Sequence, residues 1–323
     1  MTAPAPPDLA SSLEDTAVTI VSVTTNLANT TACVVDPSMG VSVVSTALAA
    51  ENDPSAGPEF AFCRPIAPNW ALFNGQDPAQ HGPSLVGIGH AYQLETSSLF
   101  AVVGDGIKLS PRILRVFDSG VVGPNTRRAG GATSRTSQRT QPRFVAELVF
   151  RDSIIDVQWT RHNLVVVLSR SVNVFASRTL KHRHRITTRR QRTRSTQRRR
   201  SVVKLCPFGS FQRPDAGRAT SPDSEEYWAT LVNAEIEDLL LVNARDAPEG
   251  SLSVLGLAGD QLHEIDTFRP HSAEVAMVAV NPLRGLVASV SSHGQLIRIS
   301  QLPRGKAHST CKLHSKRRSD VPQ

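Results

Sequence analysis

The chain has 323 residues, of which 40% are hydrophobic, and a net charge of +8, so it is long enough for one large domain or two ordinary ones. It has neither a run of 18 apolar residues nor a basic start followed by an apolar stretch, so the sequence predicts no membrane-spanning helix and no secretory signal. Twenty Gly and 21 Pro favour a turn-rich β protein over a helical one. The cysteines form no Cys-x-x-Cys pair and are expected to be reduced thiols: Cys33, Cys63, Cys206 and Cys311.

Short apolar or alternating runs bounded by Gly, Pro, Asn and Ser recur along the chain, a pattern typical of antiparallel strands. Residues 1–16 are rich in Pro, Ala and Ser and are expected to be disordered. The first three strand-rich units are expected at about 17–46, 85–118 and 144–178. A Gly/Ser/Thr/Arg segment at 119–143 separates the second unit from the third and is expected to be a flexible loop.

Two further units follow, at about 227–266 and 270–300, and a polar basic tail is expected at 301–323. The segment 179–226 between the third and fourth units is expected to be a flexible loop. Its arginine-rich part, 181–200, carries ten positive charges and no acid, so the rest of the chain sums to −2 and the basicity is local. Three interpretations stay open: a solvated insertion, attachment to anionic lipid, or nucleic-acid binding and nuclear import. The segment 181–200 has no aromatic residues between its basic residues, so no specific nucleic-acid partner is expected.

The fifth unit shows the strand pattern most clearly. An apolar run, Val275–Val280, stops at Asn281-Pro282, a second begins at Leu286, and Gln295–Ser300 alternates between apolar and polar residues. Three short strands in thirty residues are typical of one blade of a β-propeller. In the third unit, the uninterrupted apolar run Val165–Leu168 predicts a strand buried on both faces.

The fifth unit also resembles the central blade of the PROPPIN family, which are seven-bladed propellers related to WD repeats. The family pattern begins with a His, continues through an Ala/Ser-rich turn and a Gly, and ends in Ile-Arg. The chain keeps this pattern at His271, Asn281, Gly285, Ala288, Ser291, Gly294, Ile297 and Arg298. The second and third units follow the family's second and third blades closely. The resemblance implies an all-β fold, a β-propeller of WD-repeat type.

The family's lipid site is also implied by this resemblance. A phosphoinositide headgroup needs Arg for a bidentate grip, and further donors such as His, Ser and Thr complete the binding of its phosphate oxygens. The resemblance places the leading His, the turn Ser and the strand Arg at His271, Ser291 and Arg298. It also implies three contacts at positions where this chain departs from the family pattern: His293 at the family's Lys position, Gln295 at its Thr position, and Arg304 as the remnant of its arginine pair.

Five recognisable units stand where the family has seven blades, so the resemblance implies a propeller truncated at its C-terminus. Propellers close by pairing the first and last blades, which removes exposed sheet edges. A chain with five blades and no closing strand therefore has either an open edge or a strained ring. A true five-bladed ring is the alternative interpretation.

The resemblance implies a non-catalytic protein that binds phosphatidylinositol 3-phosphate or the 3,5-bisphosphate in autophagy, and no cofactor or metal is expected. No esterase, metalloprotease or nucleotide-binding motif occurs in the sequence. The expected partners are phosphoinositide-containing membranes and docking autophagy proteins. The expected state is a cytoplasmic monomer, peripheral on preautophagosomal, endosomal or vacuolar membranes. The alternatives are a protein-docking scaffold that has lost lipid binding, and nucleic-acid association through the arginine-rich segment.

Overall fold

The computed structural model describes most of the strand-rich part of the chain. The ranges are 22–25, 31–36, 40–45, 62–66, 88–95, 97–106, 109–118, 143–188, 202–211, 229, 231–243, 246–294, 296–302 and 306–312. The expectations for 1–16 and for most of 119–143 concern residues outside these ranges. No helix in the described ranges has the length and apolar character needed to cross a membrane.

The described residues form five four-stranded antiparallel sheets. The first sheet contains β1 (Ser22–Thr25), β2 (Thr31–Asp36), β3 (Gly40–Ser45) and β4 (Phe62–Ile66). The second contains β5 (Ile88–Gln93), β6 (Leu99–Gly104), β7 (Ile113–Asp118) and β8 (Arg143–Val149). The third contains β9 (Ile154–Trp159), β10 (Asn163–Leu168), β11 (Ser171–Ala176) and β12 (His182–Thr187).

The last two sheets have the same order. The fourth contains β13 (Val203–Pro207), β14 (Asp238–Val242), β15 (Leu252–Ala258) and β16 (Gln261–Phe268), with the 3-10 turn η2 (Phe208–Ser210) after β13. The fifth contains β17 (Val275–Asn281), β18 (Leu286–Ser291), β19 (Leu296–Gln301) and β20 (Lys306–Lys312), with η3 (Pro282–Arg284) between β17 and β18. Each sheet is a meander of consecutive strands, as in a propeller blade.

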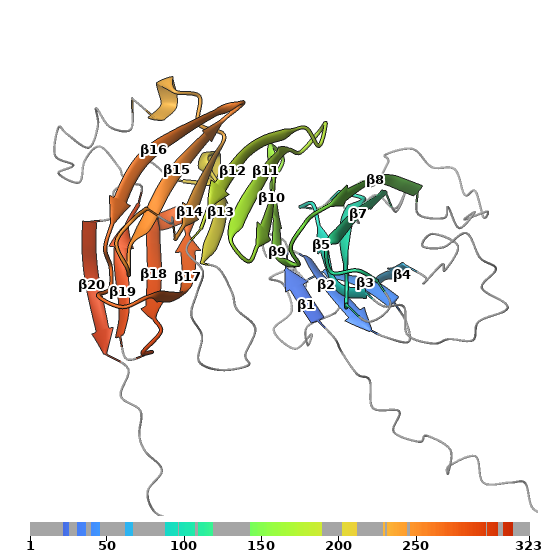
Figure 1. The fold of residues 1–323 in the computed structure, drawn as a ribbon, viewed down its shortest axis with the longest axis horizontal. Helices are drawn as coiled ribbons and strands as arrows, with labels where there is room; N and C mark the ends of the chain where they lie inside the picture. Colours follow the sequence, from blue (N-terminus) through green and yellow to red (C-terminus); the bar gives the residue numbers. More distant parts are fainter. Residues whose placement is uncertain are drawn as a thin grey trace, which may run out of the picture.

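The five blades follow one another around an open arc (Figure 1). The first strand of each blade lies against the first strand of the next: β1 beside β5, β5 beside β9, β9 beside β13 and β13 beside β17. The first and fifth sheets stand at opposite ends of the arc, and no ladder joins their described strands (Figure 1). The described blades therefore form an open arrangement, and the alternative of a closed five-bladed ring is not observed.

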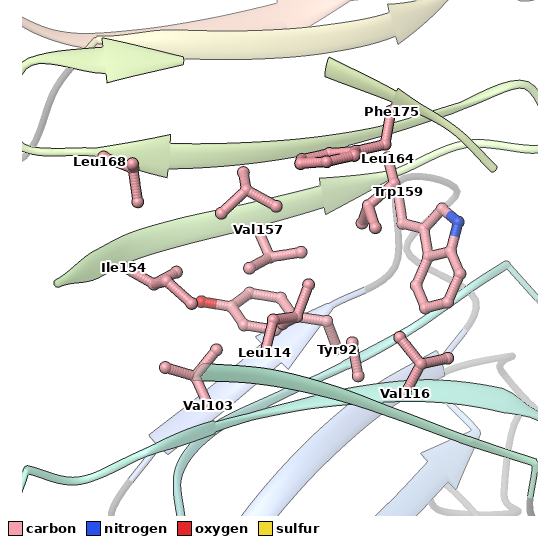
Figure 2. Packing of buried hydrophobic residues seen from close by; sticks show 12 residues of the cluster. Tyr92, Val103, Leu114, Val116, Ile154, Val157, Trp159, Leu164, Leu168 and Phe175 are labelled. Atoms are coloured by element: carbon pink, nitrogen blue, oxygen red, sulfur yellow. The ribbon is translucent and has the colours of Figure 1, made fainter. Parts of the chain in front are cut away.

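The hydrophobic core lies between neighbouring blades. Figure 2 shows Tyr92, Leu114 and Val116 of the second sheet pointing toward Trp159 and Leu164 of the third. Every residue of β10 and of β14 is buried, because each strand packs against a blade on both sides. The prediction of a doubly buried strand in the third blade is therefore confirmed.

The fifth sheet has one face that packs against the fourth blade and one that does not. Val278 and Val287 join the cluster shared with the fourth blade. The reverse face carries two cross-strand rows, and none of their members belongs to a core cluster of the described residues. These rows are Met277–Val290–Ile297 and Ala279–Ala288–Ile299. Met277 is 60% exposed, so this is an apolar surface in contact with solvent in the described part of the chain.

The outer strands do not follow the unit boundaries that the sequence pattern predicted. β8 completes the second sheet, although the pattern assigned these residues to the third unit at 144–178. β4 lies beyond 17–46, and β20 lies in the predicted basic tail. An outer strand has one unpaired edge and little buried surface, so its sequence need not show the apolar alternation of the inner strands.

The prediction of a flexible loop at 179–226 is wrong for β12 and β13, which both pair within sheets. Two basic residues find acidic partners on the fourth blade: Lys181, which directly precedes β12, and Arg183 on β12. Lys181 Nζ lies 2.8 Å from Asp260 Oδ2, and Arg183 Nη1 lies 2.9 Å from Glu237 Oε2. The first part of the arginine-rich segment is therefore an ordered strand held by ion pairs, while 189–200 lies outside the described residues.

Candidate functional site

The candidate site lies at one end of the fifth sheet, where the loop that enters β17 meets the turn between β18 and β19. In that turn the Gly294 N–H donates to the Ser291 carbonyl at 2.9 Å, and Gly294 adopts a φ of 66°, which favours glycine. The Ser292 N–H donates to the Glu274 carbonyl at 2.7 Å, which ties the turn to the entering loop. The sequence therefore fixes both segments that border the site.

His271 anchors the entering loop. Its backbone N–H donates to the Gly250 carbonyl at 3.4 Å. Gly250 has a φ of +81°, and a Cβ there would lie 1.9 Å from the His271 carbonyl oxygen, so only glycine fits. The residue is 4% exposed, and its Nε2 lies 3.1 Å from Ser289 Oγ. Ser289 Oγ in turn donates to the Arg298 carbonyl at 3.4 Å, so His271 is linked through one hydroxyl to the strand that carries Arg298.

Arg298 is half-buried on β19, opposite Ser289 on one side and Thr310 on the other. Its Nε is buried and makes no hydrogen bond within the described residues, where the arginine also forms no ion pair. A buried guanidinium nitrogen without a partner is costly. An anion that reached the guanidinium group would offset part of this cost.

The second sheet offers an internal comparison for Arg298. Arg115 occupies the same register position on β7, opposite Val102 and Glu147. There the Arg115 Nε lies 2.7 Å from Glu147 Oε2, so the chain supplies its own counter-ion. In the fifth sheet the position of Glu147 is taken by Thr310, which carries no charge. The two blades share one arginine position, and in the described residues only the second blade neutralises it.

The predicted site residues are placed as follows. Ser291 ends β18, is 8% exposed, and lies two residues beyond Ser289, so the two serines share a face of the strand. His293 is exposed on the turn. The structure thus groups His271, Ser291 and Arg298 at one end of the blade. Gln295 and Arg304 lie outside the described residues.

Sequence reasoning missed Ser289 and Thr310. Ser289 could have been found from the strand period, because it precedes Ser291 by two residues in an alternating run. Thr310 gave no signal, because its importance depends on the pairing of β19 with β20 and on the contrast with Glu147. An arginine beside two serine hydroxyls can bind an anionic oxygen group. Groups of three or more His, Cys, Asp or Glu side chains suited to a metal ion do not occur in the described ranges.

Comparison with known proteins supports a specific type of propeller. No family model matches the chain. The curated autophagy-related protein 18 of Komagataella pastoris is 24% identical over 243 residues, which cover 73% of this chain and 39% of the relative. The structure of Hsv2 from Kluyveromyces lactis matches with a TM-score of 0.55 at 13% identity, over 91% of this chain and 62% of that one. KlAtg21, in complex with the coiled coil of AgAtg16, matches with a TM-score of 0.51 at 14% identity, over 91% of this chain and 70% of that one.

These relatives are PROPPINs. The PROPPIN resemblance is confirmed. The β-propeller fold is confirmed as well, since the PROPPIN structures align with nearly all of the chain. The chain spans about two fifths of the curated PROPPIN and roughly two thirds of the solved PROPPIN chains.

The stability of the fifth blade is expected to fall in mild acid. Burial lowers the pKa of His271, and the Arg298 charge acts in the same direction. The unfolded chain therefore takes up a proton near pH 6.5 while the folded blade resists it. The contribution of His271 to the free energy of unfolding is fully present above that pH. It decreases as the pH falls, by at most about 1.4 kcal/mol per pH unit.

Urea denaturation at a series of pH values measures this dependence. His184, whose pKa burial also lowers, contributes in the same direction, so the decisive comparison is between variants. His271→Gln is expected to weaken the dependence of the free energy of unfolding on pH, whereas His293→Gln, at an exposed position, is expected to leave this dependence unchanged. An unchanged slope in His271→Gln would contradict the assignment.

Proposed function

We propose that the chain is a non-catalytic propeller that binds the phosphorylated headgroup of phosphatidylinositol 3-phosphate or the 3,5-bisphosphate at the end of its fifth blade. The observation that carries the proposal is the uncompensated charge of Arg298, in contrast to Arg115 with its Glu147 partner. A phosphate needs an arginine that no internal carboxylate has already neutralised.

In this proposal the surrounding residues have different roles. Ser291 offers a hydroxyl on the same face of β18 as Ser289, the residue opposite Arg298, and His293 is exposed on the following turn. His271 belongs to the site through Ser289, since its Nε2 lies next to that hydroxyl and its ring is buried. Gln295 and Arg304 are assigned to the site by the family resemblance alone.

The relatives support a biological setting for this proposal. One of them is named an autophagy-related protein, and another, KlAtg21, was solved with the coiled coil of AgAtg16. We infer that this chain likewise acts in autophagy as a cytoplasmic monomer that is peripheral on phosphoinositide-bearing membranes and docks autophagy proteins. The seven arginines of 189–200 add an attraction to anionic lipid of about 1 kcal/mol per residue near the surface.

Vesicle flotation tests this function. Phosphatidylcholine vesicles that carry phosphatidylinositol 3-phosphate are compared with vesicles that carry phosphatidylserine at equal surface charge. Binding through the blade site is expected to favour the phosphoinositide and to persist when the arginines of 189–200 are replaced by serine. The replacement leaves 181–188 intact, because β12 and its ion pairs belong to the fold.

The other outcomes identify the alternatives. Equal binding to both vesicles that disappears with the arginine replacement indicates bare electrostatic attraction through 189–200 and contradicts the blade site. No binding to either vesicle indicates a protein-docking scaffold without lipid binding. Salt-sensitive binding to nucleic acid that is lost with the same replacement indicates the third candidate function.

A further inference from the structure

The outer strand of the second blade, β8, combines a free edge with exposed apolar side chains. It is the last strand of its sheet, so one edge has no pairing partner among the described residues. Eight large hydrophobic side chains are exposed in the described part of the chain, and three of them lie on this one strand of seven residues. These are Phe144 at 49%, Val145 at 48% and Val149 at 70% exposure.

Comparable outer strands carry charges that discourage pairing with another chain. β12 has His182 and Arg185 in addition to the ion-paired Arg183, and β16 has His263, Glu264 and Asp266. Charged side chains on an edge strand are a usual means of preventing edge-to-edge association. The one acid of β8, Glu147, is engaged by Arg115. The middle of the β8 edge is therefore left without this protection.

The fold holds β8 in place while leaving its valines free of core contacts. Phe144 packs edge-on against Phe117 with ring centroids 5.8 Å apart, and Leu148 packs on the core cluster shared with the third blade. Val145 is the extra residue at a bulge in the pairing with β7, and Val149 lies opposite Ile113. A bulge bends an edge strand and re-aims its side chains.

Basic residues lie at both ends of this edge. Arg143 begins the strand, and Arg112 and Arg151 are exposed at the other end, where the Phe150 N–H donates to the Arg112 carbonyl at 2.9 Å. Two copies of β8 paired antiparallel would place these arginines near one another, which disfavours a second copy of the chain. A lipid surface cannot satisfy the free backbone donors and acceptors of the edge.

We propose that the β8 edge is a docking site for an extended segment of a partner protein, which adds to the second blade as a fifth strand. The segment has alternating apolar residues that cover Val145 and Val149, and acidic residues at its ends that meet the arginines. Main-chain hydrogen bonds supply much of the affinity in this mode of recognition. This site is remote in sequence from the lipid site, and it stands whether or not the chain binds lipid.

The test uses the full chain and a fluorescent synthetic peptide of alternating valine and threonine with two glutamates at each end. Fluorescence anisotropy is expected to show binding. A twin peptide N-methylated along its core, and a second twin with lysine in place of glutamate, are each expected to bind at least about tenfold more weakly. If either control peptide binds as tightly as the original peptide, the proposal is overturned. The N-methylated peptide keeps the side chains but lacks the backbone N–H donors, and the lysine peptide keeps the backbone but lacks the acidic ends.

Variants of the chain locate the binding site. The double substitution Val145→Lys, Val149→Lys is expected to weaken the peptide by about 10- to 100-fold, because it removes two apolar contacts and adds charge to the edge. Val232→Lys, at a valine that is 61% exposed, is the matched control and keeps full binding. An equal effect of both changes overturns the proposal, as does sedimentation showing that the chain self-associates through β8. Both variants are expected to keep the phosphoinositide binding measured by flotation.

Discussion

Arg298→Ala is expected to weaken binding to vesicles that carry phosphatidylinositol 3-phosphate by about 10- to 150-fold. A hydrogen bond to a charged group contributes about 1.5–3 kcal/mol, and each 1.4 kcal/mol is tenfold in affinity. The loss follows from the geometry, because Arg298 has a buried Nε without a partner and no acid opposite it on β20. Flotation over a range of lipid concentrations measures the change.

A second variant separates the charge of Arg298 from its contribution to packing. Thr310→Glu places a carboxylate where the second blade has Glu147, so it supplies Arg298 with an internal counter-ion. We expect the same loss of lipid binding as in Arg298→Ala, with a fold that melts no earlier than the original. Thr310→Gln, of similar size but uncharged, is the matched control and keeps binding. Unchanged binding in Arg298→Ala would remove the basis of the proposed lipid site.

Leu240→Ala is expected to lower the free energy of unfolding by about 2–5 kcal/mol, the range for truncating a fully buried leucine. Leu240 is 0% exposed and belongs to the cluster that joins the third and fourth blades. Its strand is buried on both faces, so neighbouring side chains cannot collapse into the cavity from the solvent side. Urea denaturation followed by tryptophan fluorescence measures the change.

Val232→Ala provides the comparison for Leu240→Ala. Val232 is 61% exposed, and a substitution at such a position typically changes stability by no more than about 0.5 kcal/mol. A loss of stability in Leu240→Ala that does not exceed the loss in Val232→Ala would mean that the third and fourth blades are not packed as described.

Most inner strands were predictable from sequence, whereas the outer strands β4, β8, β12 and β20 and the innermost strand of the fourth blade, β13, were not. In the fifth blade, the apolar run, the Asn281-Pro282 stop and the alternation before Ser300 predicted three strands, and β17, β18 and β19 lie there. β12 escaped prediction because its side chains are basic. It is held by Asp260 and Glu237, which are distant in sequence and give no local pattern. β8 was assigned to the wrong blade because a long connection separates it from β7.

The candidate site was predictable only as a grouping of residues. The spacing of His271, Ser291 and Arg298 placed them on one blade, and the structure brings them to one end of it. The spacing could not show that the imidazole is turned inward to Ser289. Nor could it show that Thr310 stands opposite the arginine, because cross-strand register depends on how two separate hairpins pair.

The apolar face of the fifth sheet has a consequence for ligand affinity. Ile297 and Ile299 lie on that face, while Arg298 between them projects to the other side of the same strand. A polypeptide that covers the two isoleucines restricts the motion of β19. The strand then loses less conformational entropy when an anion binds to Arg298. Coverage and headgroup affinity are then thermodynamically coupled, and the coupling is reciprocal, so the lipid would in turn tighten the hold of whatever occupies the back of the blade.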